Sequence, residues 1–158
     1  MSALAHAVAV AGLCMATGLV AGVFLAFSDF IMRGLDRADP AQAAAGMNGL
    51  NKTVLVSVFL TSFFLIGPVA LALSALAPVD TPAPVRAALL GGGVVFLVSV
   101  VGVTITRNVP MNNRLARADA PEACWPDYRR FWTEWNHVRT LGATASFALF
   151  LLAAAVLI

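Results

Sequence analysis

The chain has 158 residues, of which 60% are hydrophobic and only 11% are charged. Charged residues make up about a quarter of a soluble domain, so this composition excludes an ordinary soluble globular protein. The formal net charge of +2 is too small for a basic nucleic-acid-binding surface, and we expect no nucleic-acid partner.

Four stretches of the chain are free or nearly free of charge: 2–28, 53–79, 87–106 and 140–158. Each reaches the roughly 20 residues that a helix needs to cross about 30 Å of hydrocarbon. The sequence therefore predicts an all-α integral membrane protein whose partner is the lipid bilayer. We expect one four-helix transmembrane bundle over residues 1–158, with short cytoplasmic helical connectors. The predicted spans are about 4–31, 52–76, 85–106 and 137–158.

The basic residues predict the orientation of these spans. Nine of the ten Lys and Arg residues lie in or beside 32–51 and 107–136, and only Arg86 lies elsewhere. The positive-inside rule places these two connectors in the cytoplasm and both termini outside, in the plasma (inner) membrane. The first span has no Lys or Arg before it and is too long for a cleaved signal, so it is expected to be retained.

The first half of the chain carries three local signals. Gly18 and Gly22 have the small-xxx-small spacing that permits close helix contact, either inside the bundle or in a homo-oligomer. Asp39 and Pro40 predict the start of a short helix over 40–51 that runs into the second span. Pro68, after Gly67, predicts a kink in that span.

The second half begins with Gly91, Gly92 and Gly93, which should weaken the third helix or allow close packing. Pro110 predicts the end of that helix, with Asn108 as its left-handed last residue. Asn112 or Asn113 would then cap another helical turn. A last helix is expected to start near Pro121 and to run unbroken into the fourth span, with Pro126 in its first turns.

An aromatic stripe marks this last helix. Trp125, Tyr128, Trp132, Trp135 and Arg139 are spaced three, four, three and four residues apart, which is one helix face. An interfacial aromatic belt is one interpretation. The aromatic part of the stripe, from Trp125 to Trp135, is about 15 Å long and runs along the helix axis rather than around the protein, which favours the wall of a pocket or groove.

Polar residues gather at the same predicted level. Arg139 lies at or just inside the fourth span, where a charge either faces a cavity or snorkels to the phosphates. Asn48, Asn51, Asn108 and Asn136 share this level, and buried amides must find partners. We therefore expect a polar-floored, aromatic-walled cavity at the cytoplasmic end of the bundle.

Other reactive residues give weaker signals. His6 and His137 lie at opposite ends of the bundle, so no metal site is expected. His137 could act as a general base, although an interfacial role is more usual. Asp29 is expected to pair with an arginine. Neither a disulfide nor a metal pattern is indicated by the two isolated cysteines.

Four segments together resemble the anthrone oxygenase-like family of small four-helix membrane proteins, most of which have no known function. They are GVFLAFSDFIM, MNGLN, VTITRNVPMNNRLA and the W…FWTEWNHVRT segment, and the resemblance covers nearly the whole chain. It places the recurrent positions of the family at Asn51, Thr104, Asn108, Pro110, Asn112, Asn113, Trp132, Asn136 and Arg139. His137 is not among these positions.

The resemblance implies an oxygenase, since some members of the family oxidise anthrones to anthraquinones. An anthrone enolate can give electrons directly to dioxygen, so neither a cofactor nor a metal is expected. The expected ligand is an apolar aromatic small molecule. The candidate catalytic residues are Asn108, Asn112, Asn136 and Arg139. The candidate substrate-binding residues are Asn51, Thr104, Asn113, Trp125, Tyr128, Trp132 and Trp135.

Two other functions are compatible with the same sequence. The cavity could bind a quinone or a lipid without catalysis. Alternatively, the chain could be a structural subunit of a membrane complex that packs through Gly18 and Gly22.

Overall fold

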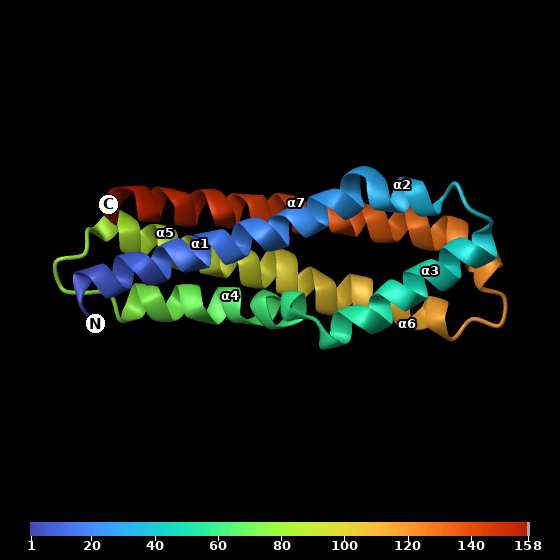
Figure 1. Ribbon diagram of the computed structural model, residues 1–158, viewed down its shortest axis with the longest axis horizontal. Helices are drawn as coiled ribbons and strands as arrows, with labels where there is room; N and C mark the ends of the chain where they lie inside the picture. Colours follow the sequence, from blue (N-terminus) through green and yellow to red (C-terminus); the bar gives the residue numbers. More distant parts are fainter. Residues whose placement is uncertain (158) are drawn as a thin grey trace.

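The computed structural model describes residues 1–157 and is built from helices joined by short connections (Figure 1). Four helices are long and apolar enough to cross a membrane, as the sequence predicts. They are Ala3–Leu35, Val58–Ala75, Ala83–Ala116 and Pro121–Leu157. The protein is therefore an all-α, four-helix integral membrane protein.

The first and third of these helices are composite. The first joins α1 (Ala3–Ala26), the π-helical η1 (Phe27–Ile31) and α2 (Met32–Leu35). The third joins α5 (Ala83–Phe96), two π-helical segments, η3 (Leu97–Gly102) and η4 (Thr104–Asn108), and α6 (Val109–Ala116). Between them lie α3 (Pro40–Thr53), the 3₁₀ segment η2 (Val54–Val56) and α4 (Val58–Ala75), and the chain ends with α7 (Pro121–Leu157).

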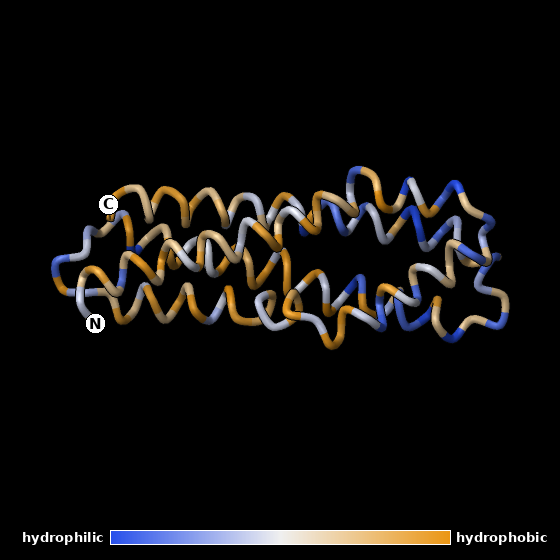
Figure 2. The backbone as a smooth tube through the Cα atoms, in the orientation of Figure 1, coloured by the Kyte–Doolittle hydropathy of each residue, from blue (hydrophilic) through white to orange (hydrophobic). Residues whose placement is uncertain are grey.

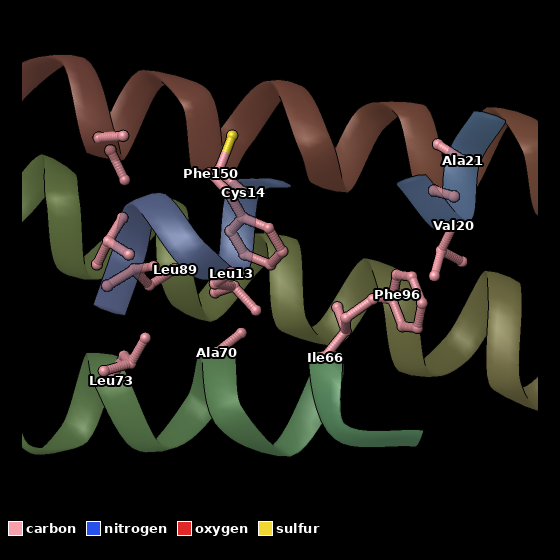
Figure 3. Packing of buried hydrophobic residues seen from close by; sticks show 14 of the residues in the cluster. Leu13, Cys14, Val20, Ala21, Ile66, Ala70, Leu73, Leu89, Phe96 and Phe150 are labelled. Atoms are coloured by element: carbon pink, nitrogen blue, oxygen red, sulfur yellow. The ribbon is translucent and has the colours of Figure 1, made fainter. Parts of the chain in front are cut away.

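The molecule has an apolar half and a polar half, which Figure 2 separates along the long axis. Both termini lie at the apolar end (Figure 1). In this half α1, α4, α5 and α7 enclose a core that includes Leu13, Ile66, Leu89, Phe96 and Phe150 (Figure 3). Large apolar side chains also cover the outside, as expected for helices whose solvent is lipid.

The polar half has a separate core. Its buried side chains come from α2, α3, α6 and α7: Met32, Ala43, Ala44, Met47, Leu115, Trp125, Tyr128 and Trp132. The bundle therefore continues beyond the apolar half. The helix α7 contributes to both cores, since its 37 residues measure about 55 Å at 1.5 Å per residue.

Small residues allow close helix contacts in the apolar half. A methyl group at Gly92 would lie 2.5 Å from Phe150, and one at Gly93 would lie 3.0 Å from Ala70, which confirms the predicted close packing. A methyl group at Gly18 would lie 3.1 Å from Phe147 of α7, whereas one at Gly22 would meet open space. The bundle thus already uses part of the Gly18 and Gly22 face, and the homo-oligomer through this face stays a prediction.

Gly142 gives a direct test of this packing. A methyl group there would overlap the Ser99 side chain of η3, so Gly142→Ala should destabilise the bundle by about 1–3 kcal/mol through overpacking. Gly22→Ala is the matched control, because it meets open space in α1 and should be neutral or slightly stabilising. Thermal unfolding in detergent measures both. Equal melting temperatures for the two variants would contradict the close η3–α7 contact.

A break in the helix precedes α4, which begins at Val58. Ser57 is extended, with φ −99° and ψ 151°, and separates η2 from α4. Its hydroxyl accepts a hydrogen bond from the Leu60 amide at 3.3 Å and donates one to the Val54 carbonyl at 2.7 Å. Ser57 is therefore the N-cap of α4. The predicted helix over 40–51 therefore does not run directly into the second span, because this serine ends one helix and starts another.

The predicted break at Pro110 was also wrong. Asn108 is right-handed helical, with φ −70° and ψ −42°, and Pro110 lies in the first turn of α6. A π-helical turn precedes it, in which hydrogen bonds join residues five apart. The regular pattern of backbone hydrogen bonds is thus interrupted before Pro110. The helix can therefore continue although this proline has no amide hydrogen to donate. Asn112 and Asn113 consequently lie within α6 rather than at a cap.

The other predicted helix starts are confirmed. The Asp39 carboxylate accepts a hydrogen bond from the Ala41 amide at 2.9 Å, with Pro40 at the first helical position. α7 begins at Pro121 and runs without interruption past Pro126. α4 likewise continues through Pro68. The predicted connector over 107–136 is thus largely helical, and only residues 117–120 separate α6 from α7.

Candidate functional site

Polar side chains from five segments, η1, α3, η4, α6 and α7, meet where the apolar half joins the polar half. We call this set the polar junction: Ser28, Asn51, Thr104, Asn108, Asn112, Tyr128, Trp132, Asn136, Arg139 and Thr140. Two of its contributing segments, η1 and η4, are π-helical. Such turns are rare in proteins overall, and those that occur are often found at functional sites. The extra residue in the turn changes which side chains face the neighbouring helix.

Arg139 is the charged centre of the polar junction and is only 5% exposed. Its guanidinium donates to Asn136 Oδ1 at 2.7 Å and to Thr104 Oγ1 at 3.3 Å. The same group lies 4.7 Å from the ring centre of Phe24 and 4.8 Å from that of Trp132, where aromatic faces attract a cation. Within residues 1–157, no carboxylate forms an ion pair with it.

Asn136 holds Arg139 in place. It is fully buried, and its amide nitrogen donates to the Phe24 carbonyl and to Ser28 Oγ, both at 2.8 Å. Ser28 in turn lies 2.9 Å from the Thr140 hydroxyl. Asn136 therefore connects α1 and η1 to the arginine, and its oxygen is the acceptor closest to the cation.

Asn112 is the hub of the second part of the polar junction. Its oxygen accepts hydrogen bonds from the Tyr128 hydroxyl and from Trp132 Nε1, both at 2.9 Å. Its nitrogen donates to Asn51 Oδ1 at 3.0 Å. One amide thus joins α3, α6 and α7.

Asn108 completes the junction from η4. It is 1% exposed, and its nitrogen donates to the Trp132 carbonyl at 3.3 Å. Four buried polar atoms at this level have no hydrogen-bond partner in the described chain: Asn48 Oδ1, Asn51 Nδ2, Asn108 Oδ1 and Arg139 Nε. Such atoms are uncommon in folded proteins, so the junction retains unused capacity for both donors and acceptors.

The aromatic stripe divides into two parts. Trp125 stacks on Tyr128 with ring centres 5.8 Å apart, and Tyr128 lies 6.4 Å from Trp132. Trp125 also donates to Asp36 Oδ1 at 3.2 Å. Trp135 is only half-buried and lies under Arg107 at 4.7 Å. The inward face of α7 therefore continues from Trp132 through Asn136 to Arg139.

Other candidate residues lie outside the polar junction. Asn113 is exposed on α6. His137 is exposed on α7, and His6 is buried in α1. Asp29 pairs with Arg33 at 2.6 Å, as predicted. Within the described range, no three His, Cys, Asp or Glu side chains are grouped as metal ligands.

Two clefts open near the junction. The first, about 460 Å³, lies between η1–α2 and α7. It is lined by Ser28, Met32, Arg33, Pro126, Asp127, Arg129, Arg130, Thr133, Glu134 and His137. The second, about 420 Å³, lies at the Ser57 break. The tryptophans line neither cleft, and only Ser28 connects the first cleft to the polar junction, so an aromatic-walled cavity stays a prediction.

The sequence did not reveal the role of Ser28. Its position in FSDFI gave no sign that it would meet Asn136, because that contact depends on the π-helical turn and on the packing of α1 against α7. The sequence shows polar residues in both segments, but it does not show which of them lie opposite each other when the two helices pack.

The fold and the site define a class: a four-helix membrane protein with a buried arginine and asparagine junction at one end of its apolar half. A family model described as anthrone oxygenase matches residues 55–149, which is more than half of the 158-residue chain. The chain belongs to the anthrone oxygenase family. The matched region includes Thr104, Asn108, Asn112, Trp132, Asn136 and Arg139. No curated protein and no solved structure matches the chain.

Proposed function

We propose that this protein is a cofactor-independent oxygenase that converts a lipophilic, anthrone-like polycyclic compound to the quinone at the polar junction. The observation that carries the proposal is the buried guanidinium of Arg139, which no carboxylate within residues 1–157 neutralises. A buried cation without a counter-charge favours an anion that forms beside it.

The proposed reaction needs dioxygen as its sole oxidant. Loss of a proton from the ring carbon opposite the carbonyl to water gives an enolate, whose oxygen carries the negative charge. The enolate carbon gives its electron pair to dioxygen and, after protonation, becomes a hydroperoxide. Loss of water from the hydroperoxide leaves the second carbonyl. Overall, one anthrone and one dioxygen give one anthraquinone and one water.

The polar junction offers groups for each part of the substrate. Arg139 Nε and Asn51 Nδ2 are unpartnered donors within the described chain, and either can stabilise an enolate oxygen. Asn108 Oδ1 is an unpartnered acceptor that suits a phenolic hydroxyl. The rings of Phe24 and Trp132, which flank Arg139, can hold a flat aromatic molecule.

Two routes lead to this position. A lipophilic substrate can enter from the bilayer between the helices. It can also pass from the first cleft, where the hydrogen bond between Ser28 and Asn136 must open. The Tyr128 and Trp132 donors are already satisfied by Asn112, so Asn112 is assigned to positioning the aromatic residues.

Oxidation of emodin anthrone under air tests the proposal. Protein in lipid nanodiscs should form quinone at least ten-fold faster than empty nanodiscs, measured by the absorbance of the product. Arg139→Ala and Asn108→Ala should each lower the protein-dependent rate by at least ten-fold, because one oxyanion donor contributes on the order of 10²–10³ in rate. Arg117→Ala, an exposed arginine after α6, is the control and should retain the rate. An unchanged rate in both junction variants would sink the assignment.

A further inference from the structure

The first cleft lies at the level where two helices leave the apolar half. Ser28 is the last residue of the charge-free stretch 2–28, and Thr140 is the first of the charge-free stretch 140–158. The lining residues continue from Ser28 along α2 and from His137 back along α7. Lipid headgroups occupy this level of a membrane protein. The volume of about 460 Å³ is within the roughly 300–1,000 Å³ of small-molecule sites.

The charges of the cleft have both signs. Arg33, Arg129 and Arg130 line it together with Asp127 and Glu134. Each arginine has one carboxylate partner, namely Asp29, Asp36 and Glu134 respectively. Asp127 has no ion-pair partner in the described chain. Partly exposed ion pairs contribute little, so a ligand can share these arginines.

Two hydrogen-bond donors on residues that line the cleft are unused. Arg129 Nε and the Thr133 hydroxyl are buried and have no partner among residues 1–157. They come from positions four apart on α7, which places them on one face, one helical turn from each other. Asp127, two residues before Arg129, does not share that helix face but lines the same cleft from another side of α7. The site therefore combines two buried donors, suited to phosphate oxygens, with a free carboxylate, suited to an ammonium group.

We propose that this cleft binds the headgroup of an aminophospholipid of the phosphatidylethanolamine type, from the leaflet on the polar side of the protein. The phosphate accepts hydrogen bonds from Arg129 and Thr133, and the primary ammonium donates to Asp127. Met32 and Pro126 supply apolar lining for the start of the acyl region. Basic pockets at a helix–membrane boundary commonly bind lipid headgroups. A purely anionic headgroup would instead meet the Asp127 charge, and choline offers no N–H donor.

Native mass spectrometry of the full-length protein in detergent tests this site. The probes are phosphatidylethanolamine, phosphatidylcholine and phosphatidylglycerol with identical acyl chains, and soluble phosphoethanolamine. We expect phosphatidylethanolamine to bind at least five-fold more tightly than the other two lipids and at least ten-fold more tightly than phosphoethanolamine. Equal affinities for the three lipids would overturn the proposal. So would phosphoethanolamine binding as tightly as the lipid, since the ligand would then be a soluble molecule.

Variants separate the two parts of the headgroup. Asp127→Asn should remove the preference for ethanolamine over choline. Thr133→Val, which keeps the side-chain shape, should weaken binding of all three lipids at least three-fold. Asp119→Asn makes the same charge change as Asp127→Asn, but at an exposed position outside the cleft, and should leave binding unchanged. Wild-type selectivity in Asp127→Asn, or wild-type affinity in Thr133→Val, would overturn the assignment. The measurement involves no turnover, so its outcome is independent of the proposed oxygenase reaction.

Discussion

Asn136→Leu is expected to destabilise the protein by about 3–5 kcal/mol, because it leaves the buried Arg139 charge without its closest acceptor. The same change removes the hydrogen bonds to the Phe24 carbonyl and Ser28. The loss should appear as a lower midpoint in thermal or denaturant unfolding in detergent. His137→Leu is the control, since it makes a polar-to-leucine change at the exposed neighbouring position and should alter stability by less than about 0.5 kcal/mol.

A double variant separates stability from function. Asn136→Leu with Arg139→Met removes the charge together with its acceptor, and paired apolar replacement of buried ionic groups is often neutral or stabilising. The double variant should therefore recover much of the stability lost in Asn136→Leu while its quinone-forming rate stays low. If the two substitutions were simply additive in stability, Arg139 and Asn136 would not form one energetic unit, and the junction as described would be incorrect.

Asn112→Leu should lower the stability of the protein to unfolding by a similar amount, about 3–5 kcal/mol. It leaves three buried groups without their partners, the Tyr128 hydroxyl, Trp132 Nε1 and Asn51 Oδ1, and each such group costs about 1–3 kcal/mol. All three tryptophans of the chain lie on α7 in the polar half. Intrinsic tryptophan fluorescence during unfolding therefore reports on the region that the substitution affects.

Two comparisons sharpen the test of Asn112. Asn113→Leu changes the exposed neighbour on the same helix and should have little effect on stability. Asn112→Asp keeps an acceptor for Tyr128 and Trp132, and the unpartnered nitrogen of Asn51 can turn toward the new oxygen. This variant should lose less stability than Asn112→Leu. Equal losses in the two Asn112 variants would show that its acceptor oxygen is not the stabilising group.

The buried arginine has a meaning beyond stability. Apolar side chains of matching shape are often at least as stable as a buried ionic group, so Arg139 and its amide partners are not needed merely to hold four helices together. A guanidinium fixed between Phe24 and Trp132 instead places a positive charge beside aromatic surface. This arrangement suits a flat molecule that becomes an anion. The proposed reaction depends on this positive charge, and the double variant removes it.

Local patterns in the sequence determined the main architecture. Hydropathy gave four membrane helices, because each span must be apolar over about 20 residues irrespective of its neighbours. Asp39 and Pro121 marked helix starts correctly, because capping depends on a few adjacent residues. The asparagines, Trp132 and Arg139 were recognised as one group, since helical spacing and predicted span ends placed them at one level.

Only the tertiary structure decided how these residues are connected. The π-helical turn before Pro110 keeps Asn108 and Asn112 on one continuous helix, and Ser57 divides the segment that hydropathy joined. The register of α7 against its neighbours turns Asn136 rather than Trp135 toward the interior. Hydrogen-bond partners such as Ser28 and Asn51 come from other helices. Spacing along one chain segment fixes a helix face, but the side chains that meet it depend on packing between helices.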